Sequence, residues 1–142
     1  EAWLHKTSYF EYAIKSDAII LGLDISIFLK NRGLFESQIE SFIAVVQILS
    51  DKKGIKFDEK LKEPISIVFF KYDLIDGDKE IEEEIKESAN RLLQVCKNRS
   101  KYASIFFVSS VGELTKDGLP KSQLSPVNVV RPLVYLLKKY RE

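Results

Sequence analysis

The stretch that most constrains the fold is residues 64–73, a mostly apolar run that ends abruptly in Lys-x-Asp. Residues 65–70 are typical of a short strand that is covered on both faces, as in a parallel sheet. A proline is acceptable at the first position of a strand, so Pro64 fits this assignment. We therefore predict a buried strand over residues 65–70, with Lys71 and Asp73 at its carboxyl end.

Two further apolar segments also end in polar residues and predict two more strands. Residues 18–24 end in the carboxylate of Asp24, and residues 104–109 end in Ser109, followed by Ser110. Stretches with helical spacing separate the three segments, and strands that alternate with helices form right-handed βαβ units in a parallel sheet. We therefore predict an α/β fold with a mostly parallel sheet flanked by helices.

The carboxyl ends of parallel strands meet at one edge of a sheet, and open α/β sheets bind ligands at that edge. Polar strand ends can also be structural, and we interpret Asp24 as a residue that closes its strand or caps a turn. The edge, called the rim below, is expected to carry the polar residues that end the three strands: Asp24, Lys71, Asp73, Ser109 and Ser110.

Two helices are predicted around the first strand. Residues 1–17 carry aromatic residues at roughly helical spacing. Ser37 and Glu40 have the spacing of a capping box, so a second, amphipathic helix is expected to start there and to end before Gly54. We expect residues 31–33 to form a loop before this second helix.

Two more helices are predicted after the second strand. Residues 76–78 have turn chemistry with an N-cap candidate, and the apolar stripe that follows predicts one long helix reaching Cys96. We interpret its acidic run, residues 80–84, as a solvated face. A long loop at 112–126 then leads to a C-terminal helix that starts near Val129. The four phenylalanines that end the second and third strands are expected in the core: Phe69, Phe70, Phe106 and Phe107.

Composition excludes several classes of protein. The 142 residues fit one domain, and 22 Lys and Arg against 21 Asp and Glu leave a net charge of +1. That balance gives no electrostatic argument for a nucleic-acid or membrane-surface partner, and no apolar run approaches the roughly 18 residues that span a bilayer. The lone Cys96 cannot form an internal disulfide, so we expect a reduced, cytoplasmic setting.

Several kinds of site are absent from the sequence. It contains neither Gly-x-x-x-x-Gly-Lys-Ser/Thr nor Gly-x-Gly-x-x-Gly, so it holds no phosphate-binding loop of either kind. One histidine and one cysteine cannot make a zinc site. A Ser-His-Asp triad would need His5, and we do not expect His5 to be catalytic. We interpret Trp3 and its aromatic neighbours as core or partner contacts.

The two strand ends at 70–73, Phe-Lys-Tyr-Asp, and 107–110, Phe-Val-Ser-Ser, resemble the nucleotide-base end of P-loop GTPases. In that family an Asn/Thr-Lys-x-Asp motif recognises guanine, and a Ser-Ala-Lys-type loop after the next strand presents a backbone N–H to the base. Residues 16–24 are similar to the family's strand after switch II. Residues 129–137 are similar to the final helix of bacterial and archaeal Ras-like families, including the double-GTPase type.

The resemblance implies that residues 1–142 are a single GTPase-like domain of the P-loop NTPase type that lacks the amino-terminal phosphate-loop part. The parent protein would bind GTP or GDP, and Mg²⁺ only where that part is present. Asp73 would accept the donors of guanine, Lys71 would pack on the ring, and Ser109 with Ser110 would present backbone N–H groups. Hydrolysis of GTP by this chain alone is not expected.

The sequence departs from the family pattern at two positions, which keeps other readings open. Phe70 stands where Asn or Thr is expected, and Val111 occupies the Ser-Ala-Lys-type loop where a lysine would flank the base. Both replace nucleotide contacts with apolar surface, so a degenerate GTPase-like module that binds a protein partner is the alternative. A third reading is an unrelated doubly wound domain of the flavodoxin or receiver type.

Overall fold

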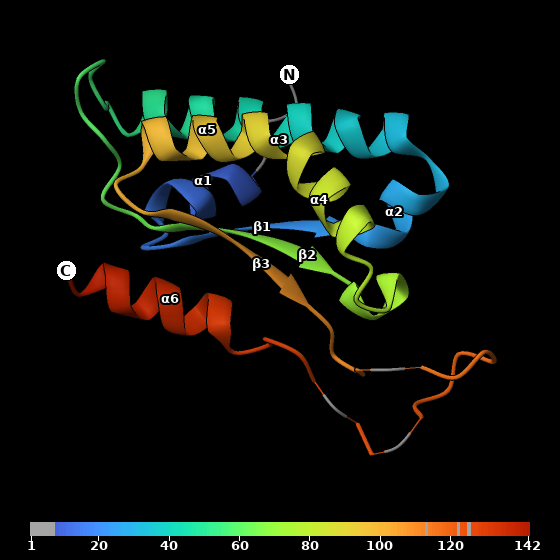
Figure 1. Ribbon diagram of the computed structural model, residues 1–142. Helices are drawn as coiled ribbons and strands as arrows, with labels where there is room; N and C mark the ends of the chain where they lie inside the picture. Colours follow the sequence, from blue (N-terminus) through green and yellow to red (C-terminus); the bar gives the residue numbers. More distant parts are fainter. Residues whose placement is uncertain (1–7, 113, 122, 125) are drawn as a thin grey trace.

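The computed structural model describes residues 8–112, 114–121, 123–124 and 126–142, so Trp3 and His5 lie outside the described residues. The three-stranded sheet has helices on both of its faces (Figure 1). The elements in chain order are α1 (Ser8–Lys15), β1 (Ile19–Asp24), α2 (Ile25–Lys30), α3 (Arg32–Lys52), β2 (Ile65–Phe70), the 3₁₀ turn η1 (Tyr72–Ile75), α4 (Lys79–Ser88), α5 (Asn90–Arg99), β3 (Ala103–Val108) and α6 (Arg131–Tyr140).

The sheet is all-parallel with the order β1-β2-β3, which confirms the predicted α/β class. The register places Asp24 opposite Phe70, and Phe70 opposite Val108. All three strands therefore finish at the same rim, as the sequence predicts. This alignment brings the residues that follow each strand within reach of one another.

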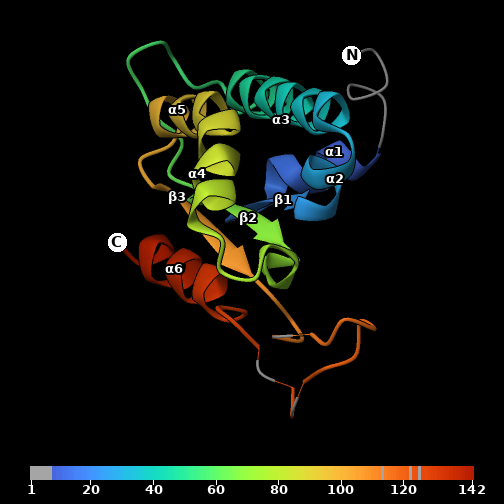
Figure 2. The same cartoon turned by 45° about the vertical axis from the view of Figure 1, so that its right-hand side comes forward.

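The two faces of the sheet are covered by different helices (Figures 1 and 2). Alternate residues such as Leu23, Ile67 and Phe69 are buried in a core that includes residues of α3 and α5. On the other face lies α6, where the Ser66 Oγ donates to the Pro132 carbonyl over 3.4 Å. Helices on both faces of the sheet explain why the central strand β2 is buried from Ile65 to Phe69.

Phe70 is not a core residue, contrary to the expectation from its neighbours. Its side chain is 44% exposed, whereas Phe69 is fully buried. Successive side chains in a strand point to opposite faces, so Phe70 lies on the α6 face, beyond the part that α6 covers. The ring lies on Gly22, where an added Cβ would come within 2.5 Å of it.

The structure corrects the predicted start of the helix after β1. Residues 31–33 are not a loop, because α3 begins at Arg32 and Asn31 is its N-cap, accepting from the Leu34 N–H over 3.0 Å. Ser37 lies inside the helix and donates its Oγ–H to the Gly33 carbonyl over 2.9 Å. The capping-box assignment was wrong because serine can bond to the preceding turn of a helix as well as start one.

Of the two other helices predicted in the second half of the chain, one needs correction and one is confirmed. The expected long helix is two helices, α4 and α5, which meet at Ala89, although Asp78 is the N-cap of α4 as proposed. The predicted C-terminal helix is confirmed as α6, which begins at Arg131, two residues after Val129, with Pro132 in its first turn. Proline is well tolerated in that position because its missing N–H has no intrahelical partner there.

Candidate functional site

Asp73 lies in a short turn that follows the end of β2. The chain leaves β2 through Lys71, whose φ of 63° is left-handed, and enters η1. The turn ends at Asp76, which is also left-handed, with a φ of 45°. These two reversals turn the chain sharply at the rim.

Ser109 meets Asp73 at the rim, although 36 residues separate them. The Ser109 Oγ donates to Asp73 Oδ1 over 2.6 Å and accepts the Gly112 N–H over 3.0 Å. The Ser109 backbone pairs with Val127 in both directions, at 3.1 and 2.8 Å, and Ser109 is 1% exposed. The hydroxyl is therefore held in one orientation, with the carboxylate as its acceptor.

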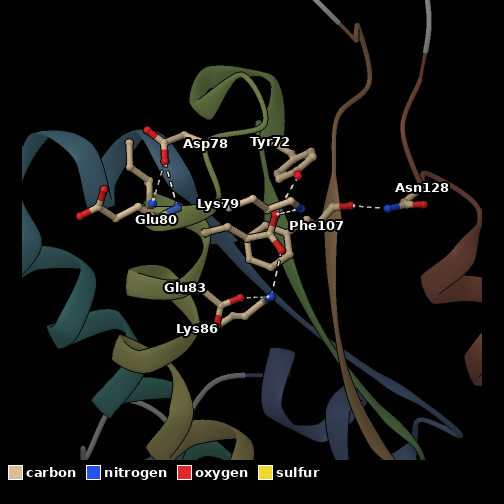
Figure 3. Close-up of polar contacts among 10 residues, drawn as sticks. Tyr72, Asp78, Lys79, Glu80, Glu83, Lys86, Phe107 and Asn128 are labelled. Carbon is tan, nitrogen blue, oxygen red and sulfur yellow. Dashed lines mark hydrogen bonds and ion pairs between the residues drawn. The ribbon is translucent and has the colours of Figure 1, made fainter.

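A cavity of about 230 Å³ opens beside this contact. Next to the lining residue Val127, the Asn128 side-chain amide donates to the Phe107 carbonyl over 3.1 Å (Figure 3). Charged, aromatic and apolar groups all contribute to the lining: Tyr72, Asp73, Asp76, Gly77, Ser109, Gly112 and Val127. A hollow with a few convergent polar groups is the usual form of a small-molecule site.

The other two predicted site residues lie apart from this cavity. The Lys71 ammonium forms an ion pair with Asp24 Oδ2 at 2.7 Å and donates to the Ser26 Oγ over 3.3 Å. Ser110 is exposed and contributes nothing to the lining. The structure thus brings Asp73 and Ser109 together and directs Lys71 toward the end of β1.

Asp24 has a structural role, as expected. Its Oδ1 accepts the Ser26 N–H over 2.8 Å and caps α2. Burial alone would raise the pKa of Asp24, but the hydrogen bonds from Lys71 and Ser26 outweigh it and lower the pKa. Asp24 is therefore an ionised partner that holds Lys71.

Glu82 and Tyr72 form a network beside the site that the sequence interpretation missed. The Tyr72 hydroxyl donates to Glu82 Oε2 over 2.8 Å, and Lys79 and Lys86 each form a 2.9 Å ion pair with the same carboxylate (Figure 3). Burial opposes ionisation of Glu82, yet these three donors lower its pKa to about 2. Glu82 is 8% exposed, so the acidic run 80–84 is not a uniformly solvated face.

Part of this network was visible in the sequence. Lys79, Glu82 and Lys86 are spaced three and four residues apart, and side chains at that spacing are neighbours on a helix. Tyr72 belongs to a different element, so its contact with Glu82 depends on how α4 packs beside η1. No local pattern contains that information.

A larger hollow, of about 780 Å³, lies at the amino ends of the strands. It is lined mainly by lysines and carboxylates, and one of these pairs, Lys53 and Glu63, is joined at 2.5 Å. Open α/β sheets bind ligands at the carboxyl ends of their strands, so the smaller cavity is the better candidate site.

Among the described residues, no group of three or more histidine, cysteine, aspartate or glutamate side chains is arranged to hold a metal ion. Within the same part of the chain, no helix is both long and apolar enough to cross a bilayer. In comparisons with protein-family models, with curated proteins and with solved structures, the chain has no significant match.

Proposed function

We propose that the protein containing this domain binds a guanine nucleotide by its base, with Asp73 as the group that reads it. The observation that supports this is the contact between Asp73 and Ser109 at the cavity on the rim. Guanine offers two adjacent donors, N1–H and the exocyclic amine, and one carboxylate can accept both. Ser109 occupies Oδ1 from one side, which fixes the direction of the carboxylate.

The size of the cavity supports a base as the bound group. Its volume of about 230 Å³ is smaller than the about 300–1,000 Å³ of sites that enclose a drug-sized ligand. The sequence contains no phosphate-binding loop, so the ribose and phosphates would lie outside the cavity. The proposal therefore separates base recognition, by these residues, from phosphate and Mg²⁺ binding, which would need a further part of a P-loop NTPase-type domain.

The roles of the remaining residues follow from where they lie. The backbone N–H of Ser110, which directly follows Ser109, is the donor proposed for the base carbonyl; because Ser110 does not line the cavity, the base would have to extend beyond the lining residues to reach it. Lys71 is held at Asp24, so packing on the base would require it to leave that ion pair. A cytoplasmic setting belongs to the proposal, consistent with the buried free thiol of Cys96.

Titration calorimetry of the full-length protein with GDP and with ADP tests the proposal. We expect heat with GDP and little or none with ADP, because adenine presents an acceptor where guanine has N1–H. Asp73→Asn should weaken GDP binding by about 10–100-fold, since hydrogen bonds to a charged group contribute about 1.5–3 kcal/mol. The asparagine oxygen can still accept from Ser109, so the fold is preserved.

Asp76→Asn is the matched control. Asp76 lines the same cavity, but asparagine readily adopts its left-handed φ of 45°, so GDP affinity should change little. Equal losses in both variants would point to net charge instead of base reading. An absence of heat with either nucleotide, or an Asp73→Asn variant that binds GDP normally, would refute the proposal.

The second candidate function is a protein-interaction module without nucleotide binding. The exposed Phe70 favours it, because its ring adjoins the edge strand β1, where Ile20 is 46% exposed on the same face. Along the flank of α6, Leu133 and Leu137 are more than half exposed. Exposed apolar side chains that gather on one surface often mark a docking site, and the calorimetry above tests whether nucleotide binds instead.

A further inference from the structure

Three consecutive side chains at the end of β2 are each tied to a different element. The Lys71 ammonium pairs with Asp24 at the end of β1. The Tyr72 hydroxyl donates to Glu82 on α4, and the Asp73 carboxylate accepts from Ser109 after β3. The turn is therefore held by long-range contacts in three directions.

The turn needs such ties because its own backbone is unfavourable. Lys71 and Asp76, at its two ends, have φ values of 63° and 45°, and neither is a glycine. A non-glycine residue in the left-handed region costs energy and persists only where the surroundings hold it there. The backbone bonds that close the turn include the Leu74 N–H to the Lys71 carbonyl at 3.0 Å and the Asp76 N–H to the Asp73 carbonyl at 3.2 Å.

Tyr72 is the most firmly held of the three side chains. Its ring packs against Phe107 with the centroids 5.3 Å apart, and Phe107 stacks in turn on Phe69 at 4.9 Å. Its hydroxyl meets Glu82, which is nearly buried and itself fixed by Lys79 and Lys86 (Figure 3). By contrast, the side chain of Lys71 is 52% exposed, so its ion pair with Asp24 holds the turn weakly.

We infer that Tyr72 and Glu82 are positioning residues for base recognition: their hydrogen bond fixes the turn that aims the Asp73 carboxylate into the cavity. This inference rests on the proposed function. Neither residue has to contact the ligand through its polar group, because the Tyr72 hydroxyl is used by Glu82. They act on the ligand through the orientation of Asp73.

Orientation matters most for a ligand that uses both carboxylate oxygens. Guanine presents two adjacent donors, whereas hypoxanthine presents N1–H alone. A carboxylate held in one direction can form the second hydrogen bond only with guanine. When the carboxylate is free to rotate, this second bond to guanine is lost before the single bond to N1–H. The Tyr72–Glu82 contact should therefore determine the preference for GDP over IDP more than the affinity for IDP.

The test measures the ratio of the dissociation constants for IDP and GDP in the full-length protein. Tyr72→Phe keeps the ring on Phe107 and removes the donor, and the ratio should fall by about two- to ten-fold, the range expected for one hydrogen bond. Glu82→Gln should lower the ratio in the same direction. The controls are Tyr135→Phe, whose ring packs on Phe106 on the α6 face, and Glu83→Gln, the exposed neighbour.

A second readout needs no nucleotide. Hydrogen exchange of the Gly112 amide, which donates to Ser109, and of the Leu74 amide, which closes η1, reports whether the turn is held. Both amides should exchange faster in Tyr72→Phe than in Tyr135→Phe at equal melting temperature. If Tyr72 contributed only to global stability, Tyr72→Phe would not speed exchange at these two amides selectively. The IDP-to-GDP ratio would also stay unchanged.

The outcomes separate the two proposals. A wild-type protein that binds no GDP refutes the proposed function, and the exchange readout then still decides whether Tyr72 holds the turn. Unchanged exchange of Gly112 and Leu74 in Tyr72→Phe overturns the positioning role whatever the protein binds. An unchanged IDP-to-GDP ratio in a protein that does bind GDP also overturns it.

Discussion

At the scale of single residues, Glu82 shows how burial changes the meaning of a charge. It belongs to the acidic run 80–84, and the other three carboxylates of that run are less buried than Glu82. Because Glu82 faces Tyr72 and lies between Lys79 and Lys86, its negative charge is compensated by three donors. An ionised carboxylate is tolerated away from water only when it is paired in this way.

The pKa of Glu82 makes a prediction about stability and pH. Its pKa is about 2 in the folded protein against 4.5 for an ordinary glutamate, so its ionised form stabilises the fold. That contribution is fully present above pH 4.5 and is lost as the pH falls toward 2. Glu82→Gln should lower the free energy of unfolding by about 1–3 kcal/mol from pH 7 down to about pH 4.5, and by progressively less as the pH falls from there toward 2.

Urea denaturation of wild type and variant between pH 7 and pH 2 measures this difference. Glu83→Gln is the control, since Glu83 has an exposed side chain and shares Lys86 with Glu82. A difference between wild type and Glu82→Gln that stays constant from pH 7 to pH 2 would contradict the prediction. An equal loss of unfolding free energy in Glu83→Gln would show that the effect comes from Lys86, which pairs with both carboxylates.

At the scale of elements, the junction between α2 and α3 depends on one side chain. Asn31 ends α2, its backbone N–H donating to the Ile27 carbonyl over 2.7 Å, and its side chain starts α3. A single residue with φ of −154° thus separates two helices. The sequence interpretation placed a loop here because Asn-Arg-Gly is common in turns, and the same residues serve equally well as a cap and a first helical turn.

Asn31→Ala should therefore lower the free energy of unfolding by about 0.5–2 kcal/mol, the usual cost of losing an N-cap. Ser37→Ala should change it by less than about 0.5 kcal/mol, because Ser37 is an exposed residue inside the helix. Thermal or urea denaturation compares the two. A larger loss in Ser37→Ala than in Asn31→Ala would restore the capping box as the start of α3.

At the scale of the whole molecule, one core joins the sheet to the helices on one of its faces. Residues of β1, β2, α3 and α5 share this core, and Cys96 lies within it, fully buried. Burial raises the pKa of the Cys96 thiol to about 12. The thiolate is the reactive form, so Cys96 is protected by both its protonation and its inaccessibility.

The reaction of Cys96 with a thiol reagent should therefore report unfolding of the whole domain. At pH 8 we expect no appreciable labelling of the native protein, and a labelled fraction that follows the loss of circular dichroism as urea is added. A Ser110→Cys variant in a Cys96→Ala background supplies an exposed thiol, which should react at once. Rapid labelling of Cys96 without urea would show that the core opens locally around α5.

Those parts of the fold that local sequence patterns specify could be predicted. The segments that became β1, β2 and β3 are short, mostly apolar runs, as in strands covered on both faces, and their alternation with helices implied a parallel sheet. Helix boundaries were less predictable. Asn31 and Ser37 both have side chains that can cap a helix, and packing of the neighbouring elements decides which one does.

The candidate site divides in the same way. Asp73 and Ser109 could be assigned to one rim from the sequence, because parallel strands must end together and each residue follows its own strand by a short, known distance. The sequence did not predict the direction of the Lys71 side chain or the burial of Glu82 against Tyr72. They depend on contacts across 45 and 10 residues of chain, between elements whose relative positions no single segment encodes.

The sequence by itself therefore determined the three parallel strands and the residues that end them, because a short apolar run with a polar end is a local pattern and the order of strands and helices can be followed along the chain. Only the tertiary structure decided which of those residues meet. It joined Asp73 to Ser109 at 2.6 Å beside a cavity and turned Lys71 away to Asp24. The physical reason is that hydrogen bonds and ion pairs act over a few ångströms, so they form only after distant elements have packed together.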